Sequence, residues 1–80
     1  MNALDVAGAL REARAAGVDR LDAQLLLAHV LGRPRTWLLA HDDAPVGAPL
    51  VERFRACLGR RAAGESLAYL VGTKDFHGLS

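Results

Sequence analysis

Regularly spaced glycines divide this 80-residue chain into short segments, and that spacing constrains the fold more than any other feature. Four of them follow runs in which apolar residues recur at three- and four-residue steps: Gly17, Gly32, Gly64 and Gly72. Such a recurrence is typical of amphipathic helices, and a glycine just past a helix readily adopts the left-handed conformation that ends it. The pattern therefore predicts an all-α fold, a small bundle of about five short helices.

The composition supports one compact domain. Apolar residues make up 51% of the chain, which argues against a disordered segment. The net charge of +1 argues against a strong electrostatic hold on nucleic acid. The single cysteine, Cys57, excludes an internal disulfide and is expected to pack as a small apolar residue rather than act as a catalytic thiol. The N-terminal residues show neither a signal peptide nor a membrane span, so we expect a cytoplasmic protein.

The first two helices are predicted from their caps. Asn2 is expected to cap a helix that ends near Ala16, and Asp19 is expected to cap a second helix that ends at Leu31. The apolar stripe of this second helix is too broad for a surface helix, so it is predicted to lie at the centre of the bundle.

The remaining segments are predicted to be shorter or irregular. A third helix is expected over residues 34–40, a loop over 41–47, and a fourth helix over 48–63 with Gly59 at a close helix contact. A short fifth helix is expected over 67–71. Residues 73–80 alternate polar and apolar side chains, which predicts an extended segment that requires a partner from outside this chain.

No pattern in the sequence predicts catalysis. It contains no phosphate-binding glycine loop and no evident pair of nucleophile and base. His41, Asp42 and Asp43 are adjacent, but neighbouring loop residues do not converge on one ion without a further ligand. We therefore expect no catalytic, cofactor-binding or metal-binding residue in this chain.

Five residues are candidates for contact with a partner: Arg33, Arg35, Trp37, Arg60 and Arg61. Each has an alternative role within the fold. Arg60 and Arg61 fall in the last turns of the fourth helix, where cations complement the helix dipole, and Arg61 can also pair with Glu65. Trp37 is either a core residue or an exposed docking residue.

Three blocks of the chain resemble one known family. They are LDAQLLLAHVLG at residues 21–32, RTWLLAH at 35–41, and RRAAGESLAYLVGTKDFHGL at 60–79. The order and spacing of the blocks are similar to those of the HemK/PrmC family of protein-(glutamine) methyltransferases. Two positions depart from the common family pattern, with Gln24 in place of an acid and Ser66 in place of proline.

The resemblance implies a division of the chain and a function. Residues 1–72 correspond to a helical N-terminal domain that docks the substrate, and residues 73–80 begin a linker hairpin to a catalytic domain that this chain lacks. Enzymes of the family transfer a methyl group from S-adenosylmethionine to the glutamine of a Gly-Gly-Gln tip in class I peptide chain release factors. The expected partners are therefore a release factor and the enzyme's own catalytic domain, and this chain alone should be inactive.

Two alternatives remain open from the sequence. One is a free-standing helical domain that binds proteins or nucleic acid, although a helix-turn-helix reader needs an exposed polar recognition helix. The other is a structural role, in which the domain only holds the linker hairpin against the catalytic domain.

Overall fold

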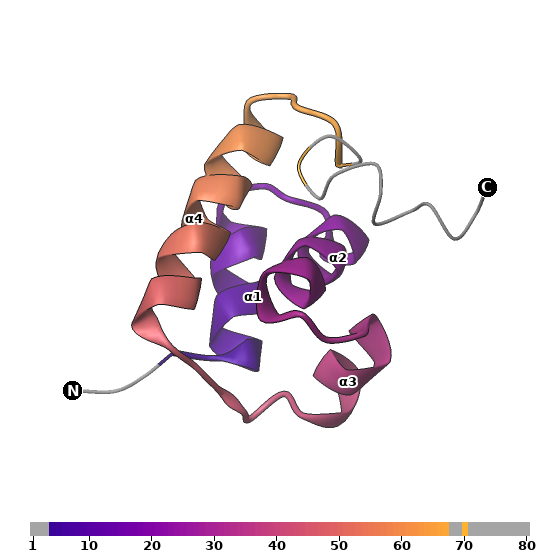
Figure 1. Ribbon diagram of the computed structural model, residues 1–80. Helices are drawn as coiled ribbons and strands as arrows, with labels where there is room; N and C mark the ends of the chain where they lie inside the picture. Colours follow the sequence, from indigo (N-terminus) through magenta and orange to yellow (C-terminus); the bar gives the residue numbers. More distant parts are fainter. Residues whose placement is uncertain (1–3, 68–69, 71–80) are drawn as a thin grey trace.

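The computed structural model of this chain describes residues 4–67 and residue 70. Its elements in chain order are β1 (Leu4–Asp5), α1 (Val6–Ala15), α2 (Arg20–Leu31), α3 (Arg35–Ala40), β2 (Pro45–Val46) and α4 (Ala48–Ala62). Figure 1 shows α1 and α4 side by side, with α2 seen almost along its axis and α3 below it. The predicted all-α class is confirmed, since the two strands together hold only four of the described residues.

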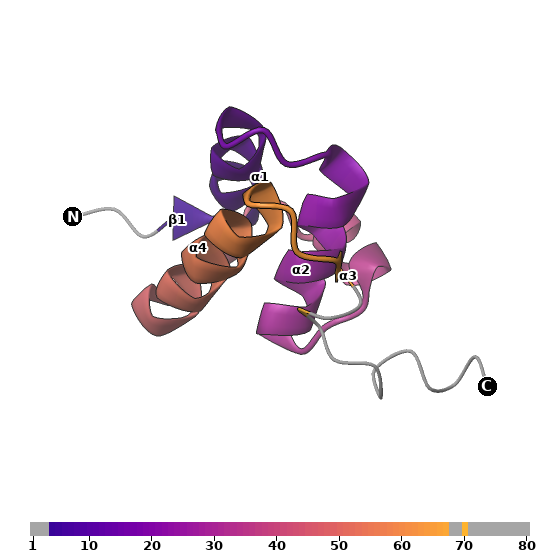
Figure 2. The same ribbon diagram turned by 90° about the horizontal axis from the view of Figure 1, so that it is seen from above.

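Helix α2 lies at the centre of the bundle, as its apolar stripe predicts. It packs against α1, α3 and α4, and Figure 2 shows α1 and α4 on one side of it and α3 on the other. Leu26 and Leu27 are consecutive and both fully buried, which requires neighbours on more than one face of the helix. A helix that is apolar on most sides can be stable in water only in such a position.

The core is built from small and branched side chains around one large ring. Phe54 of α4 is fully buried, and Leu58 and Val51 lie on the same side of that helix at four- and three-residue steps. The other fully or nearly buried apolar side chains are Val6, Ala9, Ala13, Val18, Ala23, Leu26, Leu27, Ala28, Val30, Leu38 and Val46. Cys57 is half-buried against this core, as expected for a packing residue.

The first helix begins later than predicted. Its N-cap is Asp5 rather than Asn2, and the Asp5 carboxylate accepts a hydrogen bond from the Gly8 amide at 2.7 Å. Leu4, which the periodicity places in the helix, instead lies in β1. The two residues of β1 are extended because they pair with a distant segment, and that pairing leaves Asp5 in the β conformation that an N-cap requires.

The predicted loop over 41–47 contains the partner of β1. Leu4 pairs with Val46 and Asp5 with Pro45 in an antiparallel register, and Val46 is almost fully buried. The same segment also supplies acceptors for the first turn of α1. The amides of Val6 and Ala7 donate to the carbonyls of residues 44 and 42, at 3.0 and 2.9 Å. Helix starts leave such amides without intrahelical partners, so this loop completes α1.

Three of the four glycine signals for helix ends are confirmed, and Gly72 lies outside the described residues. Gly17, Gly32 and Gly64 all have positive φ angles, of 85°, 68° and 107°. Asp19 caps α2 as predicted by accepting from the Leu21 amide at 3.2 Å. Helix α3 starts one residue later than predicted, because Pro34 is its N-cap. Helix α4 ends one residue earlier than predicted, because Ala63 is its C-cap.

The C-terminal predictions fall mostly outside the described residues. The amide of Leu70 donates to the carbonyl of Ser66 at 3.2 Å, a bond of the helical i to i−4 type. Residues 68–69 and 71–80 lie outside the description, so the fifth helix and the extended segment at 73–80 stay predictions. Within the described part of the chain, no helix has the length and hydropathy needed to cross a membrane.

Gly59 does not mark a close helix contact, contrary to the sequence-based expectation. A Cβ atom built at this position would meet nothing within 4 Å, and the residue is exposed on α4. The close approach is at Gly8 instead, where a Cβ would lie 2.7 Å from a methyl carbon of Leu4. Glycine can occupy an exposed helix position without any functional or packing reason, so a glycine within a helix does not by itself predict a closely packed neighbour.

Because no atom lies near the position of a Cβ at Gly59, a substitution there should change stability only through helix propensity. Gly59→Ala should raise the free energy of unfolding by about 0.5–1 kcal/mol, because alanine has the higher helix propensity and meets no neighbour. Gly32→Ala is the matched control and should lower it by about 1–2 kcal/mol, since Gly32 is left-handed at φ 68°. Urea unfolding followed by circular dichroism measures both changes. A destabilised Gly59→Ala variant would mean that a neighbour packs against this face.

An ion pair between Glu12 and Arg55 joins α1 to α4. The guanidinium donates from Nε to one carboxylate oxygen at 2.9 Å and from Nη2 to the other at 2.7 Å. These hydrogen bonds hold the pKa of Glu12 below its usual value and raise the pKa of Arg55. The planar guanidinium matches the carboxylate in this two-bonded geometry, which a lysine cannot reproduce.

The lowered pKa of Glu12 gives the pair a defined pH dependence. Its carboxylate contributes stability above the unfolded-state pKa of about 4.3, and this contribution is lost as the pH falls through the lower folded-state pKa. Glu12→Gln should therefore unfold at a lower urea concentration than the parent at pH 7, and the difference should be smaller at about pH 3, where the Glu12 carboxylate of the parent is partly protonated. Glu52→Gln is the control, because Glu52 is 3.9 Å from Arg55 and largely exposed. An equal difference at both pH values would contradict this account.

Candidate functional site

The candidate partner residues Arg33 and Trp37 lie together at the corner between α2 and α3. The guanidinium carbon of Arg33 is 4.9 Å from the centre of the Trp37 ring. The His41 ring stacks on Trp37 with 4.5 Å between ring centres and an angle of 18° between the planes. His41 Nδ1 also lies 2.9 Å from the Trp37 carbonyl oxygen, which fixes the ring at the end of α3. We call these three residues the Trp37 stack.

The Trp37 stack combines both roles that the sequence leaves open. Trp37 is half-buried and packs against the core, while Arg33 and His41 are exposed. Aromatic rings with one covered face and one wet edge are enriched in protein interfaces. The stack can thus anchor α3 and also offer a flat, cationic surface to a partner.

Arg35 is occupied within the domain. Its Nη1 donates at 2.9 Å to the side-chain oxygen of Gln24, the one buried polar residue among those described. A buried amide oxygen without a donor would cost about 1–3 kcal/mol, so this bond supports the packing of α3 on α2. The family resemblance places an acid at this position, and an arginine partner suits either residue.

The last turn of α4, which carries Arg60 and Arg61, lies at the other end of the bundle from α3 (Figure 1), and each arginine is engaged in an ion pair. The predicted pairing of Arg61 with the Glu65 carboxylate is wrong. Arg61 reaches Asp22 at the start of α2 at 2.9 Å, and donates to the Glu65 backbone carbonyl at 3.2 Å. The Glu65 carboxylate pairs with Arg60 instead, at 2.9 Å.

These contacts make Arg61 a clamp on the segment that follows α4. Its guanidinium joins the end of α4, the start of α2 and the backbone of the segment after Gly64. Arg60 and Arg61 also lie in the last turn of α4, where the helix dipole favours cations, as predicted. The five predicted residues therefore separate into two groups at different ends of the bundle, and they do not form one site.

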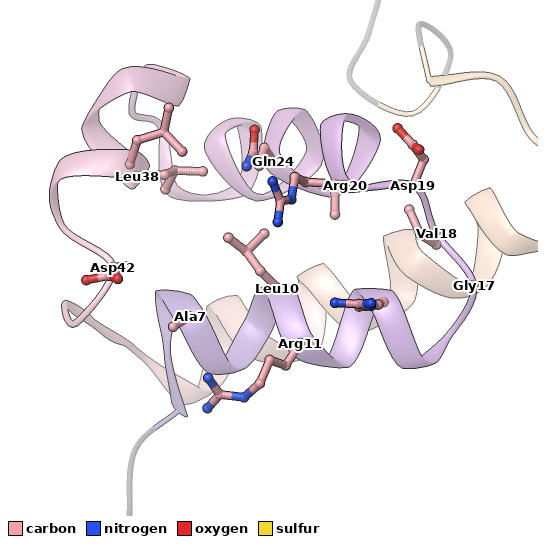
Figure 3. A pocket seen from close by; sticks show the side chains of 13 residues that line it. Ala7, Leu10, Arg11, Gly17, Val18, Asp19, Arg20, Gln24, Leu38 and Asp42 are labelled. Carbon is pink, nitrogen blue, oxygen red and sulfur yellow. The ribbon is translucent and has the colours of Figure 1, made fainter.

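A groove that sequence reasoning missed opens between α1, α2 and α3. Its volume is about 890 Å³, and Figure 3 shows side chains of α1 and α2 facing each other across it. The lining residues are Ala7, Leu10, Arg11, Arg14, Gly17, Val18, Asp19, Arg20, Ala23, Gln24, Leu38, Leu39 and Asp42. The one available sequence signal is the outward-facing Arg11 and Arg14 beside half-buried Leu10.

The described residues form a groove and an aromatic stack at the surface of the domain. Among them, no three His, Cys, Asp or Glu side chains come close enough to hold a metal ion. The groove and the Trp37 stack combine apolar surface with guanidinium groups. That combination suits recognition of another macromolecule.

Comparison with known sequences identifies the family of this chain. Residues 3–72 match the PrmC N-terminal domain family. The chain belongs to that family. Its relatives include release factor glutamine methyltransferases of Bordetella pertussis, 50% identical over 62 residues, Burkholderia pseudomallei, 48% over 66, and Escherichia coli, 37% over 71.

The PrmC N-terminal domain accounts for a small part of these relatives. The matches cover 78%, 82% and 89% of this chain but only 23%, 23% and 26% of the three relatives in the same order. The chain thus spans about a quarter of the length of the curated relatives it matches. No solved structure matches it significantly.

The bonds of Arg61 predict that this residue stabilises the fold, whereas exposed Arg33 should contribute little to stability. Arg61→Ala should lower the free energy of unfolding by about 1 kcal/mol, because it removes two charge-assisted hydrogen bonds from a partly buried site. Arg33→Ala, the control, should change it by no more than about 0.5 kcal/mol. Chemical denaturation measures both, and Asp22→Ala completes a double-mutant cycle. Equal costs for Arg33→Ala and Arg61→Ala would show that the clamp has no special role in stability.

Proposed function

We propose that this domain docks the protein substrate of an S-adenosylmethionine-dependent protein-(glutamine) methyltransferase. The proposed substrate is a class I peptide chain release factor, modified on the glutamine of its Gly-Gly-Gln tip. The methyl donor and the reacting groups belong to a catalytic domain outside these 80 residues. This domain supplies binding surface.

One observation carries the proposal. The relatives are named release factor glutamine methyltransferases, and the chain matches only about a quarter of their length. Within the described residues, the groove and the Trp37 stack place guanidinium groups beside apolar surface, and no cluster suited to metal binding is present. A separate helical domain with such surfaces fits a substrate-binding role beside a catalytic domain.

The chemistry explains why such an enzyme gains from a docking domain. An amide nitrogen is a poor nucleophile, so the glutamine must be aligned closely with the methyl group of the donor. Alignment of this kind can account for about 7–11 kcal/mol of a reaction barrier. A large protein substrate can supply the necessary binding energy far from the reacting atoms. A second contact surface also raises the effective concentration of the target loop at the catalytic site.

The residues differ in how directly they can meet the release factor. We assign the Trp37 stack to partner contact, because Arg33 is exposed and Trp37 is only half-buried. Contact through Arg35, Arg60 and Arg61 stays a prediction. Each of these three is bound to an acceptor inside the domain, so such contact would have to share or replace that bond.

The arrangement of the helices favours a protein partner over a nucleic-acid duplex. A helix-turn-helix reader inserts an exposed second helix into the major groove. Here α2 is the central buried helix, and α3 has only six residues. The net charge of +1 also provides little general attraction to phosphates.

Deletion of residues 1–72 from a full-length methyltransferase that carries this domain tests the proposal. The KM for intact release factor should rise at least about tenfold, because the remote contact is lost. The KM for a short Gly-Gly-Gln peptide should change much less, since the peptide is too small to reach the domain. Steady-state methylation with both substrates measures the two values.

The peptide also controls for damage to the catalytic domain. Equal losses with both substrates would refute docking and favour the structural role. Hydrogen exchange on the full-length enzyme provides a second readout. Docking predicts new protection on the surface of this domain only when the release factor is added, whereas a structural role predicts the same protection with and without it.

A further inference from the structure

Seven of the nine arginines of this domain form two groups that lie in different places. Arg35, Arg55, Arg60 and Arg61 each bind a carboxylate or amide oxygen within the fold. By contrast, the side chains of Arg11, Arg14 and Arg20 form no hydrogen bond or ion pair with any other described residue, and all three line the groove. Folding therefore does not explain why this groove carries three guanidinium groups.

The groove presents these charges on both sides. Arg11 and Arg14 are three residues apart on α1, so they lie on neighbouring positions of one helix face. Arg20 begins α2 on the other side, and Figure 3 shows its side chain between the two helices near Leu10. A ligand seated here would meet cations from both helices.

The acids of the groove do not neutralise this charge. Two carboxylates line it, those of Asp19 and Asp42, against three arginines. Asp19 is already committed to the N-cap of α2, where its side chain accepts from the Leu21 amide. The groups left available to a ligand are therefore mainly cationic.

The floor and rim of the groove include apolar side chains. Val18 and Leu38 are buried at its base, and Leu10 is half-buried. Leu39 lines the same groove and is 56% exposed, the more exposed of the two large apolar residues that are classed as exposed in the described chain. An exposed leucine beside unpaired arginines offers both an apolar and an ionic contact to one ligand.

We propose that this groove binds an acidic segment of the release factor, in which carboxylates flank at least one apolar side chain. The inference rests on the proposed docking function and adds the surface and the chemistry that the surface recognises. The apolar side chain lies against Leu10 and Leu39, and the carboxylates pair with Arg11, Arg14 and Arg20. Planar guanidinium groups suit such carboxylates because each can donate two parallel hydrogen bonds.

The composition of the groove favours a protein segment over single-stranded RNA. Proteins that bind single strands combine a cationic track with aromatic rings on which bases stack. No aromatic residue is among the described residues that line this groove. Its apolar contacts are aliphatic and offer no ring on which a base could stack.

Charge reversal in a full-length methyltransferase that carries this domain tests the inference. The double variant Arg11→Glu and Arg14→Glu should raise the KM for intact release factor about tenfold or more, through loss of attraction and new repulsion. Its KM for a short Gly-Gly-Gln peptide should change less than twofold. The matched control is Arg53→Glu, which reverses an exposed arginine on α4 outside the groove and should leave both values unchanged.

Salt provides an independent readout of the same contact. Raising sodium chloride from about 50 to 300 mM should increase the KM of the parent enzyme for release factor more than that of the double variant, because screening weakens ionic contacts. Circular dichroism melts establish that both variants fold. The milder Arg11→Ala and Arg14→Ala pair should give an intermediate KM if the reversed charges impair folding.

Four outcomes would overturn the inference. If deletion of residues 1–72 impairs only the intact substrate but charge reversal does not, docking stands and uses another surface. If charge reversal impairs the peptide equally, the groove is occupied by the enzyme's own catalytic domain. If a short single-stranded RNA inhibits the parent enzyme but not the double variant, the ligand is RNA. If charge reversal converts a dimer to a monomer on size-exclusion chromatography, the occupant is a second copy.

Discussion

Burial of α2 on several faces is the constraint on which the rest of the structure depends. Its consecutive leucines, Leu26 and Leu27, cannot both be covered by one neighbour, so α1, α3 and α4 must surround the helix. This arrangement fixes the positions of the connecting segments. The chain between α3 and α4 crosses to the start of α1, where Val46 enters the core and the neighbouring carbonyls accept from the first amides of the helix. The small sheet follows from the same demand, because two extended residues on each side satisfy backbone groups there.

Some arginines of this domain stabilise the fold, and others have side chains that remain available to a ligand. Those that join distant elements are bound in defined geometry, as Arg55 is to Glu12 and Arg61 is to Asp22. A domain of this size buries only about 60% of the surface of its unfolded chain, so each such link is a sizeable part of a modest total stability. Arg11 and Arg14 make no such link within the described chain. Their guanidinium groups are available to a ligand without loss of a bond that holds the fold.

Local signals in the sequence predicted the helices well and the contacts between them poorly. The ends marked by Gly17 and Gly32 and the cap at Asp19 depend on one or two neighbouring residues, and the structure confirms them. The predicted start of α1 is wrong because Asn2 and Asp5 are both residue types that cap helices well. Asp5 becomes the cap because β1 pairs with residues about forty positions away in the sequence. Sequence proximity suggests an ion pair between Arg61 and Glu65, but the packing of the bundle brings the Asp22 carboxylate to Arg61 instead. The groove was missed for the same reason, since its two walls belong to different helices.

The groove arginines form no side-chain bond within the described chain, so they can be substituted with little effect on stability. Substitution of a buried residue such as Phe54 changes stability together with any contact it supports. A change at Arg11 or Leu39 alters the groove while the core and the interhelical ion pairs stay intact. If the groove binds the acidic segment proposed above, its affinity can change through such substitutions at nearly constant stability. The helices provide a rigid frame, and the charge and shape of the groove set which partner segment that frame accepts.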